Sequence, residues 1–225
     1  MGWSARRIAA AAAINNARTY LEIGVKDGDT FLDVGIERKD GVDPAFSFDT
    51  SLFATERVRF FSQTSDEFWV SRNPLTYDVI FLDGMHTFEQ TMRDLVSSMR
   101  FAHARTIWLI DDTLPSDVFS SIPHRERSFY ERKRMNLPGL PWHGDVYKLV
   151  FAIHDFIPVL NYATITGSGN PQTLAWYAAG KDFAPAVNCW EAISRKTFFD
   201  IEPALGLFRV MDEHTALAMV RADLA

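Results

Sequence analysis

Short runs of apolar residues, each bounded by turn residues, recur along the first half of the chain and predict buried strands. Two of these runs, 77–84 and 106–112, are almost continuously apolar. Such runs are typical of strands that are covered on both faces of a parallel sheet. The expected strands are 20–25, 39–44, 58–62, 77–84 and 106–112.

Helical periodicity separates some of these runs. Apolar residues recur at spacings of three and four between Phe88 and Ala102, which predicts an amphipathic helix with Thr87 as its N-terminal cap. A further helix is expected over 146–156. Strand and helix therefore alternate, which is typical of a doubly wound, Rossmann-like α/β fold with a mostly parallel sheet.

The C-terminal third of the chain is less regular. Two strands, 162–166 and 173–178, flank a turn rich in glycine and predict a C-terminal antiparallel hairpin. No repeat, low-complexity tract or linker divides the sequence, so we expect one domain. Its expected parts are an N-terminal helix (1–18), an α/β core (19–180) and a mostly helical C-terminal extension (181–225).

Composition and charge exclude several classes of protein. The 225 residues include 23 Lys+Arg and 29 Asp+Glu, and the net charge of -6 argues against nucleic acid as the main partner. The single cysteine, Cys189, excludes an intramolecular disulfide and a Cys-based zinc cage. No segment approaches the roughly 20 apolar residues that span a bilayer. The short apolar run after Arg6-Arg7 favours a helix over a signal peptide, so we expect a cytoplasmic protein that binds no membrane.

Polar residues and glycines gather where the expected strands end. In an open α/β sheet, ligands bind outside the carboxyl ends of the strands, so these positions are candidates for the functional site. They are Glu22, Gly24 and Gly28 after the first strand, Asp43 in the second, Asp83 and His86 after the fourth, and Asp111-Asp112 at the end of the fifth.

The glycine turn that follows the first strand is by itself a weak signal. Glu22 stands where a dinucleotide-binding turn often has its first glycine. Asp43, however, lies about 20 positions further on, where a carboxylate is placed to accept hydrogen bonds from both ribose hydroxyls. Together the turn and Asp43 favour a cofactor that carries a nucleoside.

Four segments of the sequence carry a resemblance to one family. They are Tyr20-Leu-Glu-Ile-Gly-Val-Lys-Asp-Gly28, Gly41-Val-Asp-Pro44, Phe81-Leu-Asp-Gly-Met-His86 and Ile110-Asp-Asp-Thr113. In this combination the chain resembles the class I S-adenosylmethionine-dependent methyltransferases, and within them the small-molecule O-methyltransferases related to the macrocin and mycinamicin sugar methyltransferases. The family more often has Asp-Gly-Ser-His and Glu-Asp in the last two segments.

The resemblance implies a role for each candidate residue. Glu22, Gly24 and Gly28 would hold the methionine part of S-adenosylmethionine, Asp43 the ribose, and Ser65, after the third strand, the adenine, with Asp83 also beside the cofactor. Asp83, Asp111 and Asp112 would hold a divalent metal, Mg²⁺. His86 would be the general base.

The chemistry of these residue types supports the same roles independently of the resemblance. Carboxylates suit Mg²⁺, a hard ion that takes oxygen ligands, and the bound ion can chelate a vicinal diol and make its hydroxyl more acidic. Histidine, with an unperturbed pKa of about 6.5, accepts a proton near neutral pH. We therefore expect methyl transfer to a hydroxyl of a small, sugar-like or polyhydroxylated metabolite.

Other interpretations remain open at this stage. The aspartates also fit turns or helix caps, and His86 also fits a residue that only contacts the cofactor. The same glycine turn fits a nucleotide-sugar or NAD-type enzyme, or a non-catalytic methyltransferase-like binding subunit. Residues 141–148 fit an acceptor-binding segment or a surface turn, and 125–134 fits a lid or a solvated helix. Related small-molecule methyltransferases often self-associate, so a homo-oligomer is among the expectations.

Overall fold

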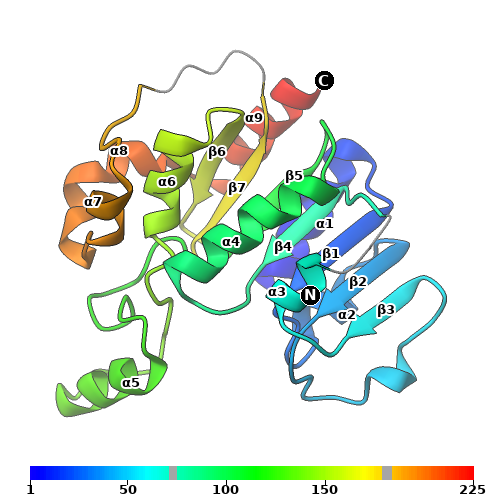
Figure 1. Ribbon diagram of the computed structural model, residues 1–225, viewed down its shortest axis with the longest axis horizontal. Helices are drawn as coiled ribbons and strands as arrows, with labels where there is room; N and C mark the ends of the chain where they lie inside the picture. The colour runs from blue at the N-terminus through cyan, green and yellow to red at the C-terminus, as the bar shows by residue number, and fades with distance from the viewer. Residues whose placement is uncertain (71–74, 179–183) are drawn as a thin grey trace.

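An eight-stranded sheet forms the centre of the computed structural model, which describes residues 1–70, 75–178 and 184–225 (Figure 1). The strand order is β3-β2-β1-β4-β5-β7-β6-β8. Neighbouring strands pair in parallel except where β7 lies antiparallel between β5 and β6. The strands are β1 (Thr19–Ile23), β2 (Arg38–Val42), β3 (Val58–Phe61), β4 (Val79–Leu82), β5 (Ile107–Ile110), β6 (Leu160–Ile165), β7 (Gln172–Tyr177) and β8 (Val210–Met211).

The expected doubly wound sheet with a C-terminal antiparallel hairpin is confirmed. Each predicted strand is present, and most are shorter than the sequence pattern indicated, because the polar residues at their carboxyl ends lie beyond the paired segments. The two-residue strand β8 was not predicted. It belongs to the C-terminal extension and pairs with β6 at the edge of the sheet.

Helices cover both faces of the sheet (Figure 1). On one face of the sheet, buried side chains of the strands pack with α3, α4 and α6 to form one core. On the other face, a second set of buried strand side chains packs with α1, α2 and α9. No helix within the described ranges is long and apolar enough to cross a bilayer. The helices are α1 (Trp3–Asn15), α2 (Asp29–Asp33), α3 (Ser65–Val70), α4 (Phe88–Ser98), α5 (Arg125–Arg134), α6 (Lys148–Phe156), α7 (Trp190–Ser194), α8 (Leu205–Phe208) and α9 (Glu213–Leu224).

Strand β4 shows why its sequence is continuously apolar. Val79 and Phe81 belong to the core beneath α1 and α9, whereas Ile80 and Leu82 belong to the core beneath α4 and α6. All four side chains are buried. Because successive side chains of a strand point to opposite faces, a strand in the middle of a two-sided sheet needs an apolar residue at every position.

Helix α4 begins at Phe88 as predicted, but its N-terminus is capped by a different residue. Thr87 occupies the capping position and its side chain makes no capping hydrogen bond. The Phe88 N–H donates instead to the Asp145 carboxylate at 2.9 Å. The cap therefore comes from a residue far along the chain, which local sequence could not indicate.

Arg7 is a fully buried arginine of α1. Its side chain contacts the turn between β6 and β7 and also the C-terminal helix α9. Its guanidinium donates to the Asn170 backbone oxygen at 2.5 Å and to the Gln172 side chain at 2.7 Å, and it also contacts the Ser168 backbone oxygen. It forms an ion pair with Glu213 of α9 at 3.2 Å. A buried cation is stable only when its donors are satisfied, so this set of acceptors fixes the turn relative to α1 and α9.

We expect Arg7→Ala to lower the free energy of unfolding by about 3–5 kcal/mol, because it leaves the buried acceptors at the β6–β7 turn without their donor. Arg6→Ala is the matched control, since Arg6 pairs with the same Glu213 while its side chain is 46% exposed. That change should cost less than about 1 kcal/mol. Urea denaturation of both variants measures the difference, and equal losses would contradict the assigned role of Arg7.

Candidate active site

The parallel strands bring the predicted site residues to one edge of the sheet. Beyond the paired strands, backbone hydrogen bonds continue between neighbouring chain segments, so the residues that follow each strand lie side by side. These N–H to carbonyl bonds join Gly24 to Val42 (2.9 Å), Asp83 to Ile23 (2.9 Å), Asp111 to Leu82 (3.0 Å) and Asp43 to Phe61 (3.2 Å).

The turn after β1 requires glycine at its first position. Gly24 has φ = 93°, and a Cβ there would lie 1.9 Å from the carbonyl oxygen of Asp83. Gly28 also has a positive φ, 83°. The turn therefore passes in close contact with the segment that follows β4, and only a residue without a side chain permits that approach.

Glu22 is buried within β1, 2% exposed, and accepts a hydrogen bond from the Tyr20 hydroxyl at 2.5 Å. The two side chains meet because residues two apart in a strand share a face. Burial raises the pKa of Glu22 to about 8, against a partly opposing effect of the Tyr20 hydrogen bond. At neutral pH the folded protein therefore favours the protonated form of this carboxyl.

Asp43 connects the end of β2 to the glycine turn. One carboxylate oxygen accepts the Lys26 N–H at 2.9 Å and the other accepts the Ala45 N–H at 2.7 Å. Each carboxylate oxygen has a second lone pair, so Asp43 retains capacity to accept ribose hydroxyls. Ser65, predicted to contact adenine, is the first residue of α3 and its hydroxyl accepts a hydrogen bond from Gln90 of α4 at 3.0 Å.

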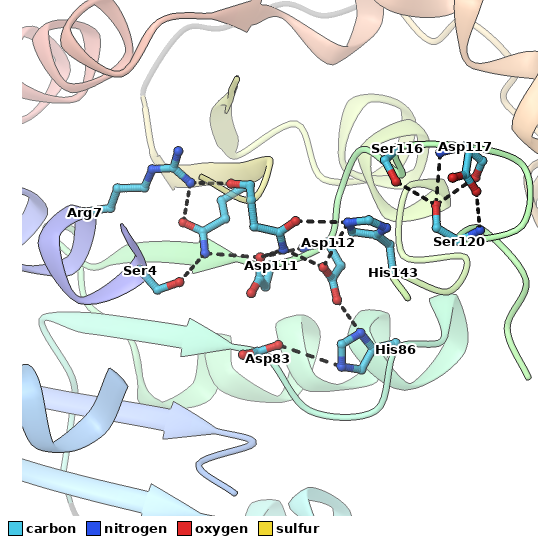
Figure 2. A network of polar contacts seen from close by, with 12 residues as sticks. Ser4, Arg7, Asp83, His86, Asp111, Asp112, Ser116, Asp117, Ser120 and His143 are labelled. Carbon is cyan, nitrogen blue, oxygen red and sulfur yellow. Dashed lines mark hydrogen bonds and ion pairs between the residues drawn. The ribbon is translucent and has the colours of Figure 1, made fainter. Parts of the chain in front are cut away.

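Asp83, His86 and Asp112 converge at the ends of β4 and β5 (Figure 2). One potential ligand atom from each lies within 4.8 Å of the others. His86 Nδ1 contacts Asp112 Oδ2, and His86 Nε2 lies 4.0 Å from Asp83 Oδ1. Asp112 adopts a left-handed backbone conformation, φ = 61°, which aspartate tolerates better than most residues.

Burial and the charges of neighbouring carboxylates raise the pKa of Asp83 and of Asp111. Burial is the main cause of the upward shift for Asp83, and the charges of Asp111, Asp112 and Glu22 add to it. Burial and the charge of Asp112 likewise raise the pKa of Asp111 to about 7. A site that concentrates negative charge away from water in this way favours a bound cation.

The side chain of Asp111 makes a different set of contacts from the side chain of Asp112. Its Oδ1 accepts hydrogen bonds from Asn170 at 2.6 Å, from Gln172 at 3.2 Å and from the Asp112 N–H at 2.8 Å. Asp111 thus contributes to a network at the β6–β7 turn, while Asp83, Asp112 and His86 form the closest group of potential metal ligands. Neither Asn170 nor Gln172 was singled out from the sequence, in which only the turn between the two strands was recognised.

Residues 141–148 pack directly on the site, so the surface-turn interpretation is wrong. The Trp142 ring stacks on His86 with a centroid distance of 4.4 Å and an interplanar angle of 23°. Gly144 has φ = 61°, and a Cβ there would lie 1.7 Å from the His86 carbonyl oxygen. His143 and Asp145 are buried.

The donor set fits a divalent cation. Asp83 and Asp112 supply oxygen atoms and His86 supplies nitrogen, which are ligand types that a divalent cation accepts. Together with neighbouring residues these groups line a small pocket. Its lining residues are Leu82, Asp83, Gly84, Met85, His86, Thr91, Asp111, Asp112 and Val146.

Solved structures of similar fold include several methyltransferases. A putative caffeoyl-CoA O-methyltransferase from Staphylococcus aureus matches with a TM-score of 0.57 and 14% identity over 78% of this chain and 83% of that chain. TomG from Streptomyces achromogenes, an O-methyltransferase in complex with SAM, gives 0.53 and 12% over 77% and 78%. An O-methyltransferase from Bacillus cereus in complex with SAH gives 0.52 and 14% over 77% and 80%.

The sequence itself matches a family model described as a methyltransferase domain over residues 1–113. The chain therefore belongs to this methyltransferase family, and its fold is that of the class I S-adenosylmethionine-dependent enzymes. No curated protein matches the chain. The prediction of an S-adenosylmethionine-dependent methyltransferase is confirmed, and the alternative of a nucleotide-sugar or NAD-type enzyme is wrong.

The raised pKa of Glu22 predicts a pH dependence of stability. Between its ordinary pKa of 4.5 and its folded value of about 8, the unfolded chain has released a proton that the folded protein retains. The free energy of unfolding should therefore fall as pH rises through this window, by at most about 1.4 kcal/mol per pH unit from this group. Glu22→Gln should remove that contribution.

Urea denaturation at pH 5.5, 6.5 and 7.5 measures the effect. The control is Glu67→Gln, the same chemical change at an exposed residue whose pKa is lowered by hydrogen bonds from Thr64. The control should keep the wild-type dependence. An unchanged slope in Glu22→Gln would show that this carboxyl is ionised in the folded protein.

Proposed function

We propose that the protein transfers the methyl group of S-adenosylmethionine to a hydroxyl of a small, sugar-like or polyhydroxylated acceptor. The observation that carries the proposal is the placement of His86, Asp83 and Asp112 beside the turn after β1. That turn and Asp43 are suited to the cofactor, and an imidazole base lies at the next strand end. Acceptor and cofactor would thus meet at one edge of the sheet.

His86 is the proposed general base. A carboxylate only accepts hydrogen bonds, so the neutral imidazole places its proton on Nδ1, which contacts Asp112, and leaves the Nε2 lone pair to receive a proton. The acceptor hydroxyl gives its proton to Nε2 while its oxygen bonds to the methyl carbon. The bond from methyl carbon to sulfur breaks, and S-adenosylhomocysteine leaves uncharged.

Two neighbours hold the base in place. Asp112 fixes the tautomer of His86 and stabilises the imidazolium that forms, as carboxylates do for catalytic histidines. The stacked Trp142 ring covers one face of the imidazole and excludes water from it. Trp142 therefore restricts rotation of the base and leaves its ring edge for the acceptor.

A divalent cation, Mg²⁺ in the proposal, would be held by Asp83 and Asp112, with Asp111 in support at the adjoining position. Its contribution when bound is to bind the acceptor's oxygen atoms and lower the pKa of the reacting hydroxyl. An acceptor with neighbouring hydroxyls suits such chelation, and this chemistry supports the sugar-like class. Asp83 and Asp112, unlike Asp111, belong to the group of potential ligand atoms that lie within 4.8 Å of one another, which supports them as the principal ligands.

Calorimetric titration with S-adenosylhomocysteine tests the cofactor. We expect binding in the micromolar range and a loss of about tenfold or more in Gly24→Ala, because a side chain at this position collides with the segment after β4. Gly35→Ala is the control, since a Cβ there meets no atom within 4 Å. Absence of binding to the unaltered protein would overturn the proposed function.

Turnover of His86→Ala tests the base. With an acceptor found by screening glycosides and polyols against labelled S-adenosylmethionine, kcat should fall about 100-fold or more. His214→Ala removes an exposed histidine of α9 and should leave kcat unchanged. An unchanged rate in His86→Ala would reduce His86 to a structural role.

The same assay in excess EDTA tests the cation separately. Loss of turnover that Mg²⁺ restores would support the proposed role of Asp83 and Asp112. Full turnover in EDTA would remove the metal from the proposal and leave the His86 step intact.

A further inference from the structure

Asn170, in the turn between β6 and β7, joins the two neighbouring aspartates. Its side-chain nitrogen donates to Oδ1 of Asp111 and to Oδ1 of Asp112, each at 2.6 Å. Its side-chain oxygen lies 3.0 Å from Nε2 of His143. Its backbone oxygen accepts from Arg7 at 2.5 Å, so the residue is anchored by its main chain as well.

The chemistry of these groups fixes the orientation of the Asn170 amide. Oδ1 of each aspartate accepts a hydrogen bond here, so the NH₂ group, which only donates, faces the two aspartates. The amide oxygen then faces His143, which must donate from Nε2. His143 is 6% exposed. A neutral imidazole protonated on Nε2 supplies the donor that the Asn170 amide oxygen requires.

The same contacts determine how Asp112 faces the site. One of its oxygens is held by Asn170, and the other contacts Nδ1 of His86. A carboxylate held at one oxygen by an amide donor has its plane fixed, so its second oxygen is directed at the imidazole. His143, Asn170, Asp112 and His86 therefore form one continuous chain of polar contacts. Figure 2 labels three of these residues, His143, Asp112 and His86.

We propose that His143 and Asn170 are positioning residues that orient Asp112, and through it the tautomer and ring position of His86. The proposal rests on the proposed function for its catalytic meaning, because His86 is the base there. Neither residue touches the reacting atoms. Their role is to keep an amide donor between two like charges that would otherwise repel each other, and to keep the carboxylate aimed at the base.

Nuclear magnetic resonance of the protein with ¹⁵N-labelled histidine tests this chain of contacts without cofactor or acceptor. At pH 7.5 we expect His143 to be the Nε2-protonated tautomer and His86 the Nδ1-protonated tautomer. Asn170→Ala and His143→Ala should both shift the ring resonances of His86, although neither residue touches it. Unchanged His86 resonances in both variants would overturn the proposal.

Two further variants separate positioning from a general loss of structure. His143→Gln keeps an N–H donor near the position of Nε2 and should restore the wild-type His86 resonances. Ser168→Ala alters the same turn, where only the backbone of Ser168 contacts Arg7, and should change nothing. If His143→Ala does not fold, the comparison of His143→Gln with Asn170→Ala decides the question, since Asn170 is only partly buried.

Kinetics give the functional consequence. Asn170→Ala and His143→Ala should lower kcat about tenfold or more while S-adenosylhomocysteine affinity stays unchanged, and His143→Gln should recover most of the rate. Equal loss in His143→Ala and His143→Gln would overturn the donor role. Failure of the unaltered protein to bind S-adenosylhomocysteine would instead overturn the proposed function, and the resonance shifts of His86 would still report the positioning contacts.

Discussion

The alignment of parallel strand ends is the constraint on which the rest of the structure depends. Pairing of β2, β1, β4 and β5 in parallel brings their carboxyl ends to one edge, and the backbone hydrogen bonds that continue past the strands hold the next residues in register. Gly24 permits the close contact between two of these segments. The turn, the acidic residues and His86 owe their proximity to this arrangement.

This alignment also places several carboxyl groups close together at the edge of the sheet, where their charge must be accommodated. Burial of an uncompensated charge is costly, so each acidic side chain near the edge acquires either a proton or a donor. Glu22 favours its protonated form beside Tyr20, whereas Asp111 receives amide donors from Asn170 and Gln172. Asp83 and Asp112 lie beside His86, and Asp112 also accepts a hydrogen bond from Asn170.

The later part of the chain completes the site. The family match ends at residue 113, yet Trp142 stacks on His86 and Asn170 holds the aspartates. Arg7 of α1 fixes the β6–β7 turn from the opposite side. The helices at both ends of the chain thus support the site by holding its framework.

Alternation, apolar runs and glycine positions report local backbone geometry, so the sheet, the glycine turn and the candidates at the strand ends were predictable from the sequence. Asp43, Asp83, His86 and Asp112 were all identifiable in this way. The donors that these side chains meet depend on the tertiary structure. Asp145 caps α4 in place of Thr87, and Asn170 donates to Asp111 and Asp112, through contacts between residues far apart in the chain. Such contacts depend on how the elements pack, which no local pattern records.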